Sequence, residues 1–283
     1  MTERERWTPL SMTLAGIPLR GVSVAGRETW FRVPSLDLAF DVGRSPAEVV
    51  PVPSLFLSHA HLDHAGGLAY WASQRRLLRL APARVFVDPV TVPAWMQILT
   101  LHAGLEGVEY HVAVEGLAPG DAVDLRRDLS VTAFRADHRV PTLGFVASEV
   151  RRRLVPAWQG RSEDDIREAL ARGEPVTQRS PRPLVAFSGD TGIGFFSSAP
   201  KEALEAKILF LECSFVAPED ASRARHYGHL HVDDIAERAE LFENEAVVLT
   251  HLTLRATPDE LRRAIARRLP PALASRAVPF LPG

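Results

Sequence analysis

Short apolar runs, each closed by proline, glycine or polar residues, recur along the whole chain and predict many strands. Three of these runs near the amino terminus predict an antiparallel start, at Leu14–Val24, Glu28–Val33 and Leu36–Asp41. Helical patterns come between the later strands, at 65–79, 91–105 and 258–268. Strands first and helices interspersed favour a sandwich of two sheets with helices on both outer faces.

Two of the predicted helices carry local start signals. Thr257, Pro258 and Glu260 supply an N-cap, a proline at the first helical position and an acid at the third. Ser162 and Asp165 have the same capping-box spacing and predict a short helix from Ser162 to Ala171. We therefore expect both helices to begin where these caps place them.

Three histidines and an aspartate fall within six residues, in His59-x-His61-x-Asp63-His64. The buried strand predicted at 54–58 ends just before them, and the helix predicted at 65–79 follows, so the cluster lies on a tight loop. Imidazole nitrogens and a carboxylate can converge there on zinc or a similar metal. A surface loop that happens to be rich in histidine is the alternative.

The first two histidines fall on the same side of an extended segment, so they can share one metal, and Asp63 and His64 can serve a second. Four more polar residues follow predicted strands and are further candidates: His138, Asp190, Glu212 and His251. An ordinary turn would explain Asp190 by itself, and His138 alone is a weak signal. Cys213 is the single cysteine, which excludes an intramolecular disulfide and leaves His, Asp and Glu as metal ligands; we expect a buried, unreactive thiol.

The motif at 59–64 is the signature of the metallo-β-lactamase superfamily, and the chain most resembles the ribonuclease Z branch, especially the short plant and cyanobacterial proteins. Nearly the whole chain takes part in this resemblance. It implies an α/β (α+β) fold, the αββα sandwich, in a single domain over residues 1–283. It also implies a zinc-dependent hydrolase that cuts the 3′ trailer from precursor tRNA by attack of a metal-bound hydroxide on the phosphodiester.

The resemblance assigns roles to the candidate residues. The first zinc takes His59, His61 and His138; the second takes Asp63, His64 and His251; Asp190 bridges the two. Manganese or iron could replace zinc. Asp63 is expected to orient the hydroxide and accept its proton. The Glu212–His229 pair separates the ribonuclease Z branch from lactamases, and His229 is expected to protonate the leaving ribose 3′-oxygen.

The chain departs from the family pattern in two places. Residues 151–180 are expected to form a short insert in place of the long arm that grips tRNA in many bacterial members. Within it, Arg151, Arg152 and Arg153 either contact RNA phosphates or simply end a strand in solvent. After the last histidine the family has Arg-Tyr, and this chain has Arg255-Ala256. Arg255 is therefore a second candidate for phosphate contact.

The composition of the chain weakens, without refuting, the hypothesis of an RNA substrate. The chain has 283 residues, 46% of them hydrophobic, and a formal net charge of −2, with a pI near 6.6. It shows no overall positive charge of the kind that accompanies nucleic-acid binding. Two alternatives stay open: a small-molecule metallohydrolase acting on a cyclic nucleotide or another phosphodiester, and a non-catalytic nucleic-acid-binding relative.

The remaining expectations concern location and assembly. The stretch 1–6 is charged and no long apolar run follows it, so we expect no secretory signal, no transmembrane helix and a cytoplasmic protein. A homodimer is implied by the resemblance alone. His102 is expected to be structural, because no ligand spacing surrounds it. His226 and His231 are expected to support the site or lie on the surface.

Overall fold

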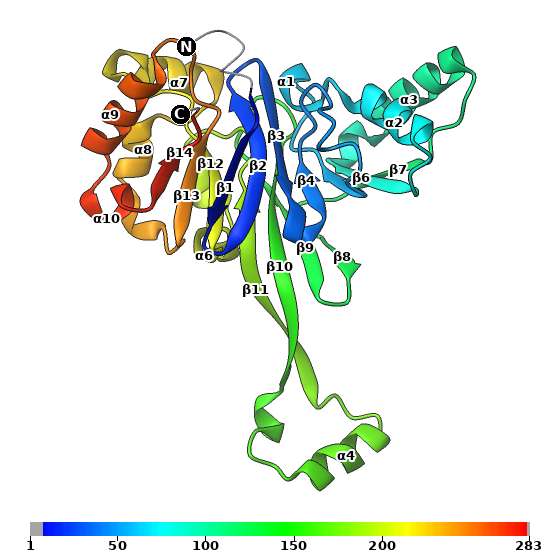
Figure 1. Ribbon diagram of the computed structural model, residues 1–283. Helices are drawn as coiled ribbons and strands as arrows, with labels where there is room; N and C mark the ends of the chain where they lie inside the picture. The colour runs from blue at the N-terminus through cyan, green and yellow to red at the C-terminus, as the bar shows by residue number, and fades with distance from the viewer. Residues whose placement is uncertain (1–7, 282–283) are drawn as a thin grey trace.

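Two seven-stranded sheets pack face to face in the computed structural model, which describes residues 8–281 (Figure 1). The charged stretch 1–6, on which the expectation about secretion rests, lies outside the described residues. The first sheet follows chain order: β1 (Leu10–Leu14), β2 (Ile17–Val24), β3 (Glu28–Val33), β4 (Leu38–Phe40), β5 (Ser54–Phe56), β6 (Ala83–Val87) and β7 (Val112–Gly116). The second, in spatial order, is β14 (Ala277–Pro279), β13 (Ala246–Thr250), β12 (Ile208–Glu212), β11 (Thr177–Phe187), β10 (Leu143–Leu154), β9 (Leu129–Arg135) and β8 (Ala122–Arg126).

Helices cover the outer face of each sheet, which confirms the αββα arrangement (Figure 1). The first sheet is covered by α1 (Leu62–Ala65), α2 (Leu68–Leu77) and α3 (Val92–Glu106). The second is covered by α5 (Phe195–Ser198), α6 (Lys201–Glu205), α8 (Val232–Ala236), α9 (Pro258–Arg268) and α10 (Pro271–Ala274). Two further helices are α4 (Glu163–Ala171) and α7 (Ala221–Tyr227). Among the described residues, no helix has the length and apolar character needed to span a membrane.

Aromatic side chains fill the space between the sheets. Phe40 stacks on Phe187 of the other sheet, with ring centroids 5.2 Å apart, and Phe31 lies 4.3 Å from Phe210. All four side chains are fully buried. Burying one such ring stabilises the fold by roughly 1.5–3 kcal/mol, so the paired rings hold the sheets together and fix the position of the strand ends.

The strand pairing decides where the functional residues meet. Each sheet is antiparallel in one half and parallel in the other; the parallel pairs include β4–β5 and β5–β6 in the first sheet and β11–β12 and β12–β13 in the second. Parallel strands present their carboxyl ends at one edge of a sheet. His59, Glu212 and His251 follow or end β5, β12 and β13 at that edge, which therefore carries the candidate site.

Several predicted element bounds need correction. The helix predicted at 65–79 spans only Leu68–Leu77 as α2, and Gly66-Gly67 separate it from the short α1 before it. Position 67 must be glycine, because an added Cβ would lie 2.4 Å from the Ser45 nitrogen. The strand predicted at Leu14–Val24 is a hairpin with its turn at Ala15-Gly16, where both residues have positive φ. The run Leu36–Asp41 is a strand only from Leu38 to Phe40.

The capped helices agree with the sequence analysis. α9 spans Pro258–Arg268, and its capping box joins Thr257 and Glu260 in both directions. α4 spans Glu163–Ala171 with the same box between Ser162 and Asp165. Both signals depend on residues three positions apart, so they act without help from the rest of the fold.

Residues 151–180 form an arm, which corrects the expectation of a short insert that replaces one. β10 and β11 pair with each other far beyond their neighbours, from Phe145↔Phe187 to Leu154↔Thr177, and α4 lies at the tip (Figure 1). The inner part of β10 is buried, whereas 151–153 are exposed. Polar side chains on both faces of the hairpin leave nothing to bury against the body, so this part of the hairpin projects away from it.

Candidate metal centre and active site

The loop after β5 turns the chain from extended to helical between His59 and His64. His61 is the N-cap of α1 with extended backbone angles (φ −63°, ψ 144°), and Asp63 and His64 lie in the first helical turn. His59 and His64 are buried, with 4% and 1% of their surface exposed. The change of direction sends the first two histidines and the last two ligand candidates to different positions, as the spacing predicted.

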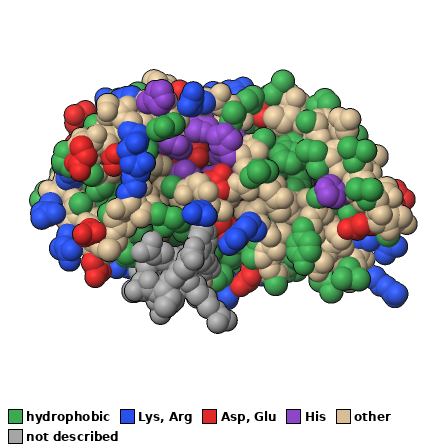
Figure 2. Space-filling model, turned by 90° about the horizontal axis from the view of Figure 1, so that it is seen from above, with side chains coloured by type: hydrophobic (Ala, Val, Ile, Leu, Met, Phe, Trp, Pro, Cys, Tyr) green, Lys and Arg blue, Asp and Glu red, His purple; other side chains and the backbone are tan. Residues whose placement is uncertain are grey.

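Two groups of possible ligands form at the shared strand edge, and a third draws on both. One contains His59, His61, His138 and Asp190, and the other contains Asp63, His64 and His251; Asp190 and His251 also form a third group with His229. Within each group the candidate ligand atoms lie within 4.8 Å of one another. All seven residues expected from the sequence are therefore brought together. Figure 2 shows histidine side chains gathered with acidic ones in a hollow on this face.

Asp190 lies between the two groups. One carboxylate oxygen is 3.3 Å from His64 Nε2; the other is 3.8 Å from His59 Nε2 and 3.3 Å from His251 Nε2. Burial alone would raise the pKa of Asp190, but the imidazoles of His251 and His64 hold it well below its usual range. An ionised carboxylate so placed can reach a cation in either group.

Hydrogen bonds from behind turn the imidazoles toward the centre. In four histidines Nδ1 lies within hydrogen-bond distance of an oxygen: His59 with Ser58 Oγ (3.0 Å), His64 with Asp41 (2.6 Å), His138 with the Gly228 carbonyl (3.0 Å) and His251 with Ser214 Oγ (2.8 Å). Nε2 of His64 and of His138 is buried and has no hydrogen-bond partner among the described residues. Inward-facing nitrogens held this way fit a metal ion.

The pKa shifts of the histidines also bear on metal binding. Burial, followed by the neighbouring His64, lowers the pKa of His59 well below its usual value, and burial also lowers the pKa of His138. Neutral imidazole is the form that binds a metal. Neutral His59 and His138 beside an ionised Asp190 therefore make a donor set for a cation. His64 differs: burial alone would lower its pKa, but the carboxylates of Asp190 and Asp41 raise it well above the usual value, so a cation bound there would displace a proton.

Asp41 and two serines support the site and were not identified from the sequence. Asp41 is fully buried at the end of β4 and accepts hydrogen bonds from Ser58 N (2.7 Å) and Ser58 Oγ (2.8 Å), while its contact with His64 Nδ1 orients that ring. Through Ser58 it also reaches His59. An acid at the end of a predicted buried strand was the available signal; Ser58 and Ser214 gave none.

Glu212 and His229 form a pair beside the two groups. Glu212 is fully buried; its oxygens accept hydrogen bonds from Ser214 N (2.8 Å) and Leu230 N (2.7 Å), and one of them lies 3.2 Å from His229 Nδ1. Burial alone would lower the pKa of His229, but the Glu212 carboxylate raises it to about 9. The His229 ring is 5.2 Å from those of both His138 and His251.

A glycine turn directs His229 to this position. α7 ends at Tyr227, and Gly228 adopts left-handed backbone angles (φ 73°), so that the chain reverses and His229 N donates to the Ala224 carbonyl. Glycine at position 228 is thus required by the turn that brings the imidazole of His229 back to Glu212.

The other predicted residues lie outside the two ligand groups. Arg151–Arg153 are on the arm, and the Arg255 guanidinium lies 3.8 Å from Asp220. His102 is exposed on α3. His226 is exposed, whereas His231 is buried and caps α8 by accepting from Asp233 N. Cys213 is buried, and burial raises the pKa of its thiol well above the usual value.

Comparisons with known proteins agree with this geometry. The model of the β-lactamase superfamily domain matches residues 31–252. Over 275 residues the chain is 34% identical to tRNase Z TRZ1 of Arabidopsis thaliana, covering 96% of this chain and 98% of that protein. The chain belongs to the ribonuclease Z family. It is also 32% identical to the chloroplastic tRNase Z TRZ2 of the same plant, over 95% of this chain and 77% of that one.

A solved structure agrees on the fold. The human short-form tRNase Z superposes with a TM-score of 0.54 at 19% identity, covering 88% of this chain and 93% of that one. Ribonuclease Z proteins are metal-dependent hydrolases, and this member has a cluster of His and Asp residues able to bind metal ions. The resemblance stated from the motif at 59–64 is confirmed.

Proposed function

We propose that this protein is a ribonuclease Z that removes the 3′ trailer from precursor tRNA. The observation that carries the proposal is the pair of buried Glu212 and partly exposed His229 beside two groups of metal-ligand candidates. A hydrolytic metal centre needs no such pair merely to hold its ions. Similarity to tRNase Z proteins along nearly the whole chain supports the same substrate.

The proposed ligands are divided between two metals. His59, His61 and His138 would hold the first, Asp63, His64 and His251 would hold the second, and Asp190 would serve both. Imidazole and carboxylate donors without thiolate suit zinc, with manganese or iron as alternatives. When bound, such a pair polarises the phosphodiester and makes water nucleophilic near neutral pH.

The chain's own side chains supply the proton transfers. Burial alone would raise the pKa of Asp63, but His251 and His64 hold it below the usual range, so Asp63 is ionised and can orient the attacking water and accept its proton. His229, kept protonated by Glu212, donates to the departing ribose 3′-oxygen. The products are a tRNA with a 3′-hydroxyl and a trailer with a 5′-phosphate.

The arm is the proposed grip on the tRNA. Arg151 lies opposite Ser180, Arg152 opposite Arg179 and Arg153 opposite Gln178, so neighbouring arginines point to alternate faces of the hairpin. Arg151 also pairs with Glu149 at 2.9 Å, whereas Arg152 and Arg153 have no ion pair among the described residues. A phosphate backbone lying along either face would meet at least one of these guanidinium groups.

A second copy of the chain is the proposed partner of α3. Leu101 and Leu105, four positions apart and therefore on one face of this helix, are 61% and 85% exposed. Large apolar side chains gathered on one face mark an interaction surface. The homodimer implied by the family resemblance would cover them. The cytoplasmic location expected from the sequence stays a prediction.

The small-molecule alternative is favoured by one observation, the formal net charge of −2. The deciding experiment incubates the metal-loaded protein with precursor tRNA and with cyclic nucleotides, maps the new RNA ends and measures metal content. We expect cleavage at the 3′ end of the mature tRNA and little turnover of cyclic nucleotides. The reverse preference would refute the proposal, and binding without cleavage of either would identify a non-catalytic relative.

A further inference from the structure

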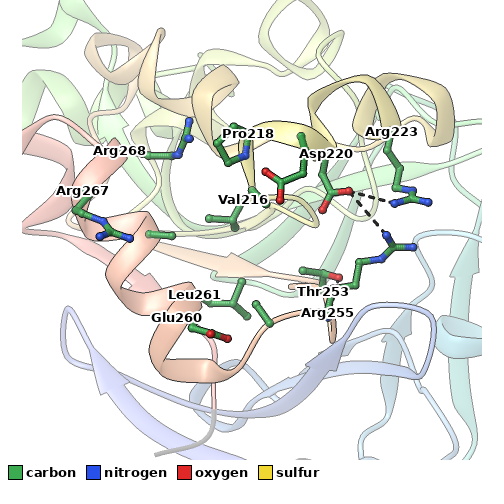
Figure 3. A pocket seen from close by; sticks show the side chains of 14 residues that line it. Val216, Pro218, Asp220, Arg223, Thr253, Arg255, Glu260, Leu261, Arg267 and Arg268 are labelled. Atoms are coloured by element: carbon green, nitrogen blue, oxygen red, sulfur yellow. Dashed lines mark hydrogen bonds and ion pairs between the residues drawn. The ribbon is translucent and has the colours of Figure 1, made fainter.

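A cleft of about 880 Å³ opens beside the metal centre. Its walls are the segment Val216–Asp220 with the start of α7, the loop Thr253–Ala256 that follows His251, and one face of α9 (Figure 3). Residues 260, 264 and 267 of α9 are spaced by four and three positions, so they line the cleft from the same side of the helix.

The cleft adjoins the catalytic edge. The Phe215 ring lies 6.1 Å from that of His229, and Val216, the next residue, begins one wall. His251, whose ring is 5.2 Å from His229, is followed two residues later by Thr253 in the opposite wall. Each wall therefore begins within two residues of a side chain that lies beside His229.

The lining combines apolar and cationic groups. Val216 and Leu261 lie between two polar ends: Asp220 with its two arginines at one end, and Arg267 with Arg268 at the other (Figure 3). Four arginines and three acids line the cleft, a formal balance of 4 − 3 = +1, and one of the arginines, Arg268, is ion-paired with Asp233 outside the lining. Such a cleft suits a ligand that has both a flat apolar part and an anionic part.

Asp220 positions one of these arginines. It is buried, with 8% of its surface exposed, and lies 3.2 Å from Arg223 and 3.8 Å from Arg255. The Arg255 side chain itself is 56% exposed. One carboxylate between two guanidinium groups holds them at the rim and leaves donor groups of Arg255 for an incoming phosphate.

We propose that this cleft binds one nucleotide of the RNA next to the scissile phosphate, with its base against the accessible lining residues Pro218, Ala256 and Ala264 and its phosphate at Arg255. The inference rests on the proposed ribonuclease function and adds to it a site for a single unpaired nucleotide. Recognition of a base through its flat face needs no particular sequence, which suits an enzyme acting on many trailers.

The test fills the cleft. Ala264→Trp places a large ring on the lining face of α9, and Ala266→Trp places the same ring on the exposed face as the matched control. Binding of a fluorescein-labelled precursor tRNA acceptor stem with a non-hydrolysable scissile linkage is measured by fluorescence anisotropy. Three forms of this RNA are compared: the intact RNA, and two in which one or the other nucleotide flanking the scissile phosphate is abasic.

For the wild type and Ala266→Trp, we expect one of the two abasic residues to weaken binding about tenfold, because one face of a base is no longer buried. Ala264→Trp should bind intact RNA about tenfold more weakly than the wild type does. In this variant the abasic residue should weaken binding further by less than about twofold. Arg255→Gln provides a second variant should Ala264→Trp not fold, and its loss of affinity should be smaller for RNA lacking the phosphate of that nucleotide.

The same abasic penalty in all three proteins would overturn the cleft assignment, as would a ribonucleoside monophosphate that competes as strongly as the RNA itself. Cleavage of ordinary precursor tRNA is measured separately. If the wild type cuts precursor tRNA normally but Ala264→Trp leaves the abasic penalty unchanged, only the cleft assignment is refuted. If Ala264→Trp reduces the abasic penalty but the wild type does not cut precursor tRNA, only the proposed function is refuted.

Discussion

Replacing His229 with alanine tests the proposed chemistry most directly. The imidazole is 15% exposed and lies 3.2 Å from the buried Glu212. After its removal Glu212 still accepts hydrogen bonds from Ser214 N and Leu230 N, so the carboxylate keeps two of its partners. We therefore expect a folded protein, destabilised by about 1–3 kcal/mol for the lost charged partner.

The expected kinetic loss is much larger. Loss of a general acid slows cleavage by about 100- to 10,000-fold, which corresponds to about 3–5 kcal/mol of transition-state stabilisation. The loss should depend on the leaving group. A ribose 3′-oxygen leaves poorly without a proton, whereas nitrophenolate leaves without one, so turnover of a nitrophenyl phosphodiester should fall far less than cleavage of precursor tRNA.

The assay compares kcat/KM on the two substrates and measures bound metal by mass spectrometry. His226→Ala is the matched control, because this histidine is exposed three residues earlier. Glu212→Gln is less informative than His229→Ala. Glu212 now accepts hydrogen bonds from two backbone N–H groups, and the new amide NH₂, itself a donor, would face one of them. Equal losses on both substrates, or loss of metal from His229→Ala, would refute the proton-donor role.

Three further predictions address the metals, the arm and the dimer. Asp190→Ala should lower occupancy of both metal sites, measured by elemental analysis, while His102→Ala should not; full occupancy would remove the bridging role. Changing all of Arg151–Arg153 to alanine should weaken precursor tRNA binding and reduce its salt dependence by about 0.7–0.9 in log–log slope per lost phosphate contact; an unchanged slope would mean a structural role. Leu101→Glu with Leu105→Glu should give a monomer in sedimentation, and an unchanged mass would place any dimer elsewhere.

Local signals accounted for much that could be predicted. The capping boxes of α4 and α9 depend on residues three positions apart, and both helices begin where Ser162 and Thr257 placed them. The motif at 59–64 combines an extended stretch with a helical turn, which already separates His59 and His61 from Asp63 and His64. The assignment of His138, Asp190 and His251 came from family resemblance, since no local spacing ties any of them to the motif at 59–64.

The tertiary structure decided what depends on distant partners. Asp41 orients His64 from 23 positions away, and Ser214 reaches His251 across 37; no local pattern marks such pairs, because only the register of parallel strands brings their ends together. Likewise, the polarity of residues 151–180 was visible in the sequence, but their projection as an arm was not. A polar hairpin pairs its own backbone whether it folds back or extends, and only the absence of apolar surface facing the body makes it project.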